Sequence, residues 1–101
     1  MQIIRGTTPT FEINLNFDAN LIEAMYVTFL QGGKVVFEKD ITSCEVKGDY
    51  VEVKLTQEET LLLNCGCTVA VQVRARLNDG TSLADEINHI KVKSVIKDGV
   101  I

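Results

Sequence analysis

Apolar and polar residues alternate along five stretches of the chain, and almost every junction between them carries a turn signal. The clearest stretch covers residues 68–78, where apolar residues occupy every second position and Gln72, Arg74 and Arg76 lie between them. Side chains on a β-strand point alternately to opposite faces, so this period of two predicts a strand with one buried and one wetted face. Further strands are predicted at residues 11–17, 25–29, 35–37, 41–46, 50–55, 81–85 and 87–93.

Turn signals predict tight hairpins between neighbouring strands. They lie at residues 31–34 (Gln-Gly-Gly-Lys), 47–49 (Lys-Gly-Asp) and 78–80 (Asn-Asp-Gly). Such residues readily adopt the positive φ angles that short hairpin loops need. Pro9 has no amide hydrogen for a strand ladder, so the opening residues should form a sheet edge or a crossing between sheets. Asp18 is expected to cap a single helical turn.

The period of two breaks at residues 56–63, where a short helix is predicted. Thr56 and Glu59 have the spacing of a capping box, in which each side chain accepts a hydrogen bond from the other residue's amide. Three leucines follow, and Asn64 with Gly66 should end the helix. A helix of this length suits a connection that crosses between two sheets and closes one end of the core.

About seven or eight short strands, with turns about ten residues apart, are typical of a β-sandwich. We therefore expect an all-β fold, an antiparallel immunoglobulin-like β-sandwich with one short helix, formed by a single domain over residues 1–101. The inward side chains should include Phe11, Ile13, Leu15, Val27, Phe29, Val51, Val53, Leu61, Val69, Val71, Val73 and Ile90.

Composition and charge narrow the classes of partner. The 101 residues are 46% hydrophobic and carry a net charge of −4, which disfavours a nucleic-acid partner because a phosphate backbone requires a basic face. No apolar run approaches the roughly 20 residues of a membrane span. The opening residues lack the basic start and apolar stretch of a secretory signal, so synthesis in the cytoplasm is expected.

Three cysteines and one histidine are the candidate metal ligands. Cys44, Cys65, Cys67 and His89 supply four donors on paper, but paired zinc-binding cysteines are usually separated by two to four residues and here only Gly66 intervenes. We expect no metal and no other cofactor, with buried or loop-edge thiols as the favoured interpretation. A small metalloprotein stays open as a third class of function.

Catalytic chemistry is not predicted. His89 is the single histidine, and no nucleophile is placed beside it by sequence. Acidic neighbours such as Glu58 and Glu59 diverge on a helix, so they do not form an acid–base pair. The sequence indicates a protein that is not an enzyme.

Surface positions provide the candidate contact residues. Arginines are common interface anchors, although a solvated face is the favoured interpretation of these two. Apolar residues near an edge or in a terminal segment often mark contact sites, although those of the C-terminal segment would also suit a last strand of the sandwich. The candidate interface residues are Arg74 and Arg76, Val35 and Phe37, and Val95, Ile96, Val100 and Ile101.

Five segments together resemble a known group of proteins. They are residues 4–10 (IRGTTPT), 27–34 (VTFLQGGK), 55–60 (LTQEET), 71–76 (VQVRAR) and 79–81 (DGT). In this order they resemble small uncharacterised proteins encoded among the virion genes of phages and prophages of low-GC Gram-positive bacteria. The resemblance covers nearly the whole chain. It extends, in architecture and gene neighbourhood, to the immunoglobulin-like N-terminal domain of phage baseplate upper proteins.

The resemblance implies a non-enzymatic virion structural or assembly protein of the tail, baseplate or neck region. It implies protein–protein contacts with other phage structural proteins and with further copies of the chain, without nucleic-acid or membrane partners, and a final location in the virion. A carbohydrate- or cell-surface-binding module of the same fold is the alternative, with Tyr26 and Tyr50 as its aromatic candidates. Residues 65–67 depart from the resemblance, because that loop is expected to lack cysteine.

Overall fold

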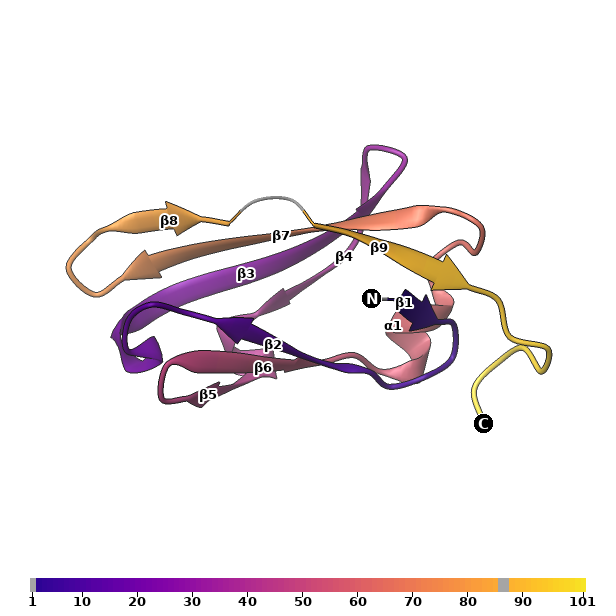
Figure 1. Ribbon diagram of the computed structural model, residues 1–101, viewed down its shortest axis with the longest axis horizontal. Coiled ribbons are helices and arrows are strands. Elements are labelled where there is room, and N and C mark those ends of the chain that lie inside the picture. Colours follow the sequence, from indigo (N-terminus) through magenta and orange to yellow (C-terminus); the bar gives the residue numbers. More distant parts are fainter. Residues whose placement is uncertain (1, 86–87) are drawn as a thin grey trace.

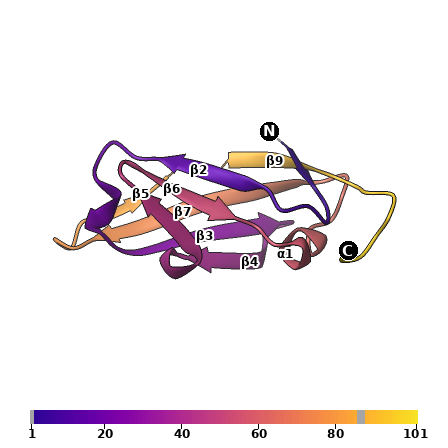
Figure 2. The same cartoon turned by 90° about the horizontal axis from the view of Figure 1, so that it is seen from below.

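The computed structural model describes residues 2–85 and 88–101, which form two stacked β-sheets (Figures 1 and 2). In the larger sheet the strand order is β1-β9-β7-β3-β4, and β8 pairs with β7 beyond the end of β9. The smaller sheet has the order β2-β6-β5. The strands are β1 (Gln2–Ile4), β2 (Thr10–Asn14), β3 (Ile22–Gln31), β4 (Lys34–Asp40), β5 (Cys44–Lys47), β6 (Tyr50–Lys54), β7 (Thr68–Leu77), β8 (Ser82–Ala84) and β9 (Asn88–Lys93).

The architecture confirms the predicted all-β sandwich. Strand pairs are antiparallel throughout the described residues except for β1 and β9, which run parallel. The three-residue strand β1 takes the number of described strands to nine, against the seven or eight predicted. Ile87, in the predicted strand 87–93, lies outside the described residues.

All of the predicted hairpins form. Gln31 pairs with Lys34 across Gly32 and Gly33, whose φ angles are 59° and 77°. The other two hairpins join β5 to β6 and β7 to β8. Because both residues of the first turn need positive φ, glycine is the natural choice at each position.

The N-terminal residues cross between the sheets, as Pro9 predicts. β1 lies at one edge of the larger sheet, and the chain then turns through Gly6 (φ 78°) to enter β2 of the smaller sheet. The Gly6 amide donates to Thr60 Oγ1 at 3.0 Å, and that hydroxyl donates to the Thr7 carbonyl oxygen at 2.9 Å. The crossing is therefore fastened to the helix.

The helix α1 (Gln57–Leu61) confirms the capping box but is shorter than predicted. Thr56 Oγ1 accepts from the Glu59 amide at 3.1 Å, and Glu59 Oε1 accepts from the Thr56 amide at 2.8 Å. Two single turns of 3₁₀ helix, η1 (Ala19–Leu21) and η2 (Ile41–Ser43), are capped by Asp18 and Asp40. The prediction for Asp18 is thus confirmed.

The core lies between the sheets and is built mainly from aliphatic side chains. Six predicted core residues are buried: Val27, Phe29, Val51, Val53, Val69 and Ile90. Phe29 stacks on Phe37 with ring centroids 4.4 Å apart. The buried apolar residues outside the predicted inward set are Ile3, Ala19, Met25, Leu55, Leu63 and Val92.

Two parts of the core prediction need correction. Leu61 is only half-buried, because Leu63, beyond the last helical turn, fills the end of the core instead. Five other predicted core residues are half-buried because they line the open side of the sandwich beside the outer edge of β2. They are Phe11, Ile13, Leu15, Val71 and Val73.

Candidate functional site

The candidate interface residues fall in three separate places. Arg74 and Arg76 lie on the outer face of the larger sheet, and Val35 and Phe37 lie on β4 at its edge. The apolar residues of segment 94–101 follow β9 at the opposite end of the molecule from β8 (Figure 1). The structure does not bring these groups together into one site.

The outer face of the larger sheet is hollowed around the two arginines. Tyr26 faces Arg74 across β3 and β7, and Arg76 pairs with Ala24. Arg76 Nε lies 3.3 Å from Glu23 Oε2, whereas Arg74 forms no ion pair with any described residue. The hollow has a volume of about 450 Å³ and is lined by Ala24, Tyr26, Thr28, Glu38, Gln72, Arg74, Ala75, Arg76 and Ser82. It offers hydrogen-bond donors, acceptors and one aromatic ring on an open surface.

The edge of β4 exposes one of its two candidate residues. Val35 is 59% exposed beside the first hairpin. Phe37 is half-buried, with its ring on Phe29, so its packing already explains its apolar character. Only Val35 is available for contact without rearrangement.

Segment 94–101 follows β9 and contains no strand. It therefore does not form a last strand of the sandwich. Ile96 is fully exposed, Ile101 is 86% exposed, and Val95 is half-buried. The tail is held by exposed contacts: Arg5 Nη1 lies 3.4 Å from Asp98 Oδ1, and the Ile101 amide donates to a glutamine side chain of α1 at 2.9 Å. Exposed pairs of this kind stabilise by less than about 1 kcal/mol each.

A further surface, not predicted from sequence, is an apolar groove that we call the seam. It runs between β2 and the inner faces of β7 and β8, and consists of two adjoining hollows of about 350 and 560 Å³ that share Ile13, Asn14, Val73 and Asp85. Leu83 on β8 contributes to its floor and is 40% exposed. The alternation of apolar and polar residues predicts which side chains point inward. How deeply these side chains are buried depends on how many strands the facing sheet contains.

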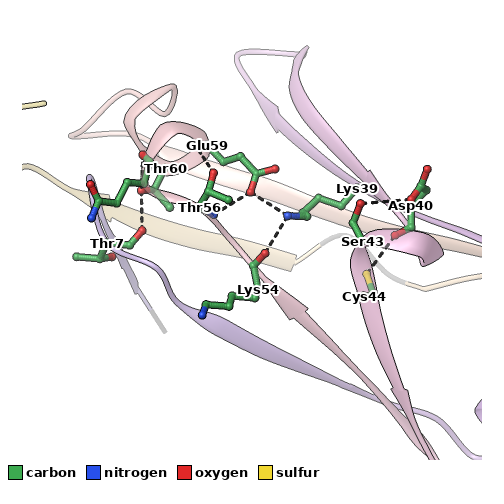
Figure 3. Close-up of polar contacts among 10 residues, drawn as sticks. Thr7, Lys39, Asp40, Ser43, Cys44, Lys54, Thr56, Glu59 and Thr60 are labelled. Carbon is green, nitrogen blue, oxygen red and sulfur yellow. Dashed lines mark hydrogen bonds and ion pairs between the residues drawn. The ribbon is translucent and has the colours of Figure 1, made fainter. Parts of the chain in front are cut away.

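A buried polar cluster joins β4, β6 and α1 (Figure 3). Lys39 is 8% exposed, and its Nζ donates to the Lys54 carbonyl oxygen at 2.8 Å and to Glu59 Oε1 at 2.9 Å. Burial raises the pKa of Glu59, but the hydrogen bonds from Lys39 and from Thr56 outweigh it, so that the pKa of Glu59 lies below its usual range. The cluster fixes the helix to the sheets.

Sequence reasoning missed Lys39, although a signal was present. Lys39 has the same strand parity as Phe37, which packs inward. A period-two reading of β4 therefore directs this lysine to the interior.

The cysteines lie in two different regions. Cys44 begins β5, and burial raises the pKa of its thiol, which keeps it protonated and poorly nucleophilic at neutral pH. Cys65 and Cys67 are exposed in the loop before β7. Across residues 2–85 and 88–101, no group of three or more His, Cys, Asp or Glu side chains could hold a metal ion.

Comparisons with known proteins add no relative: the sequence matches no protein-family model and no curated protein. Within the described part of the chain, no helix is long and apolar enough to cross a membrane.

Proposed function

We propose that this protein is a non-enzymatic structural or assembly component of a tailed phage or prophage particle, acting in the tail, baseplate or neck region through protein–protein contacts. One observation carries the proposal: the exposed apolar side chains of segment 94–101. Ile96, Val100 and Ile101 are all exposed and lie within six residues of one another. Clusters of exposed apolar residues usually mark surfaces that a partner covers.

Two further features support this function. The seam leaves apolar side chains of both sheets partly exposed along one side of the sandwich. The sequence resemblance to small prophage-encoded proteins indicates the kind of particle in which such surfaces would be covered. A chain of this type would be made in the cytoplasm and would finish in the virion, with other structural proteins and further copies of itself as partners.

Purification of particles after prophage induction tests the proposal. The chain should sediment with intact particles and occur in a fixed ratio to their tail proteins, as measured by quantitative mass spectrometry. Its recovery only in the soluble fraction, with none in particles that are otherwise complete, would reject the structural role.

A carbohydrate- or cell-surface-binding module is the second candidate, favoured by the hollow around Tyr26. An aromatic ring beside arginine, glutamine and hydroxyl groups suits a sugar ring, which offers apolar faces and many hydroxyls. Titration with cell-wall polysaccharide fragments, followed by heteronuclear NMR, would locate binding at Tyr26, Thr28 and Arg74. The matched control is Tyr50→Ala on the smaller sheet: Tyr26→Ala should abolish these shifts and Tyr50→Ala should leave them unchanged.

A further inference from the structure

The outer edge of β2 pairs with no other described strand. The Leu15 amide donates to the Asp49 carbonyl oxygen at 2.8 Å, and the Leu55 amide donates to the Pro9 carbonyl oxygen at 3.0 Å. Because the bonding direction alternates along an antiparallel pair, odd-numbered residues of β2 direct their backbone groups to β6. Thr10, Glu12 and Asn14 therefore direct theirs away from the sheet, where no described backbone group meets them.

The seam lies directly beside this edge. Phe11 and Ile13 on β2 and Val73 on β7 line it, and all three are half-buried. A strand added next to β2 would extend the smaller sheet from three strands to four and would cover Leu83. Such an addition would satisfy the backbone groups of β2 and bury apolar surface in the same step.

Segment 94–101 has the length for this position, and alternation would place Ser94, Ile96, Asp98 and Val100 on the face toward the seam. Eight extended residues span about 26 Å, more than the roughly 17 Å of the five-residue strand β2. Ile96 is fully exposed and has no apolar cover in its own molecule. Since the tail and β8 lie at opposite ends of a molecule 46 Å long, a tail from a second copy meets the seam without folding back (Figure 1).

Charge complementarity selects the same segment. Glu12, Glu52 and Glu45 face one another in a row across the three strands of the smaller sheet, on its outer face. Like charges directly opposite each other destabilise a sheet. Lys47 Nζ lies 3.4 Å from Glu45 Oε2 at one end of the row, but no described cation pairs with Glu12 at the other end.

Alternation places a cation where Glu12 needs one. A strand that directs Ile96 into the seam directs the next residue, Lys97, to the outer face of the sheet. Glu12 points to that same outer face. One register of the added strand therefore directs Ile96 and Val100, together with Asp98 between them, toward the seam and extends the row of glutamates with a lysine.

We propose that segment 94–101 of one copy of this chain adds as a strand to the free edge of β2 in a second copy, with Ile96 in the seam and Lys97 beside Glu12. The contact is heterologous, because the tail of each copy meets a different surface on the next. Contacts of this kind close into rings or continue as filaments. The inference deepens the proposed function by naming the partner of the tail, and it rests on that function only for its biological setting.

Charge reversal in the purified full-length chain tests the contact. Sedimentation velocity over a concentration series should show reversible association of the wild type that weakens as salt increases, because the Glu12–Lys97 pair is exposed to solvent. Glu12→Lys and Lys97→Glu should each weaken association by about tenfold, and the double variant should restore it, since the pair is then reversed. Glu45→Lys, at the opposite edge of the same sheet, is the matched control and should associate like the wild type.

Disulfide trapping separates association between copies from a tail that folds into its own seam. In a background with Cys44→Ala, Cys65→Ser and Cys67→Ser, one protein carries Glu12→Cys and a second carries Lys97→Cys. Mixing them under mild oxidation should give a crosslinked heterodimer, whereas Glu45→Cys mixed with Lys97→Cys should not. A chain that carries both cysteines and closes only on itself would overturn the proposal.

The outcomes also separate this inference from the proposed function. A wild-type chain that stays monomeric to roughly millimolar concentration, with no trapped heterodimer, rejects strand addition between copies even if the chain is found in particles. Trapping of the heterodimer supports it even if no particle contains the chain. Loss of association in Glu12→Lys without recovery in the double variant would contradict the assigned register.

Discussion

At the scale of single residues, Lys39 and Glu59 form the least exposed ion pair among the described residues. Removing Glu59 leaves the Lys39 ammonium buried with one carbonyl acceptor, Lys54 O. Glu59→Gln should lower the free energy of unfolding by about 2–3 kcal/mol, since a buried charge loses its counter-ion. Glu58→Gln, at the exposed neighbouring position, should change it by less than about 0.5 kcal/mol. Urea unfolding at neutral pH measures both.

Lys39→Met should be milder than Glu59→Gln. The methionine fills a similar volume, and Glu59 keeps its hydrogen bond from the Thr56 amide at 2.8 Å. The expected loss is about 1 kcal/mol, mainly from the unpaired carbonyl of Lys54. If Lys39→Met lost more unfolding free energy than Glu59→Gln, the buried lysine would not be the member of the pair that most needs its partner.

The lowered pKa of Glu59 predicts a loss of stability in acid. A carboxyl whose pKa is lower in the folded than in the unfolded chain stabilises the fold fully above its unfolded pKa, about 4.3. This contribution is lost as the pH falls through the folded value. The difference in unfolding free energy between wild type and Glu59→Gln should therefore shrink below about pH 4. A difference that is constant from pH 7 to pH 3 would contradict this assignment.

At the scale of elements, Thr60 fastens the N-terminal crossing to α1. Its side chain is fully buried and bonds both Gly6 and Thr7. Thr60→Val should cost about 1–2 kcal/mol, because it leaves the half-buried Gly6 amide and the Thr7 carbonyl without this partner. Hydrogen exchange should increase first in β1, which has only β9 as a partner. Thr8→Val, at an exposed position of the same crossing, should leave both stability and exchange unchanged.

Elements were predictable from sequence to the extent that local pattern determines them. The hairpin at residues 31–34 and the capping box at Thr56 depend on neighbouring residues alone, and both were predicted correctly. The parallel pairing of β1 with β9 joins segments about 90 residues apart, and no local pattern encodes it. The same holds for the seam, because it results from three strands facing a wider sheet. The burial of Lys39 was signalled by parity, but its acceptors are placed by packing.

At the scale of the whole molecule, the positions of the three cysteines test the hypothesis that the protein is a small metalloprotein. Cys44 and the pair Cys65 and Cys67 lie in separate regions, and the pair has one residue between its thiols. Purified protein is therefore expected to carry no stoichiometric zinc. Elemental analysis that finds about one zinc per chain, lost when Cys65 and Cys67 become serine, would establish a metal site.

Segment 94–101 is the part of the molecule on which its proposed role as an assembly component depends. Its contacts within the chain are few and exposed, so removal should leave the sandwich intact. The free energy of unfolding of a chain truncated after Lys93 should lie within about 1 kcal/mol of the wild-type value. The exposed substitution Ile96→Asp provides a second variant that keeps the full length of the chain.

Incorporation of these variants into particles is the most direct test. Tagged wild-type chain, the truncated chain and Ile96→Asp are expressed at equal levels during prophage induction, and each is quantified in purified particles. The wild type should be incorporated at a fixed ratio to tail proteins, whereas both variants should be folded in the lysate and depleted from particles. Equal incorporation of all three chains would contradict a role for this segment in assembly.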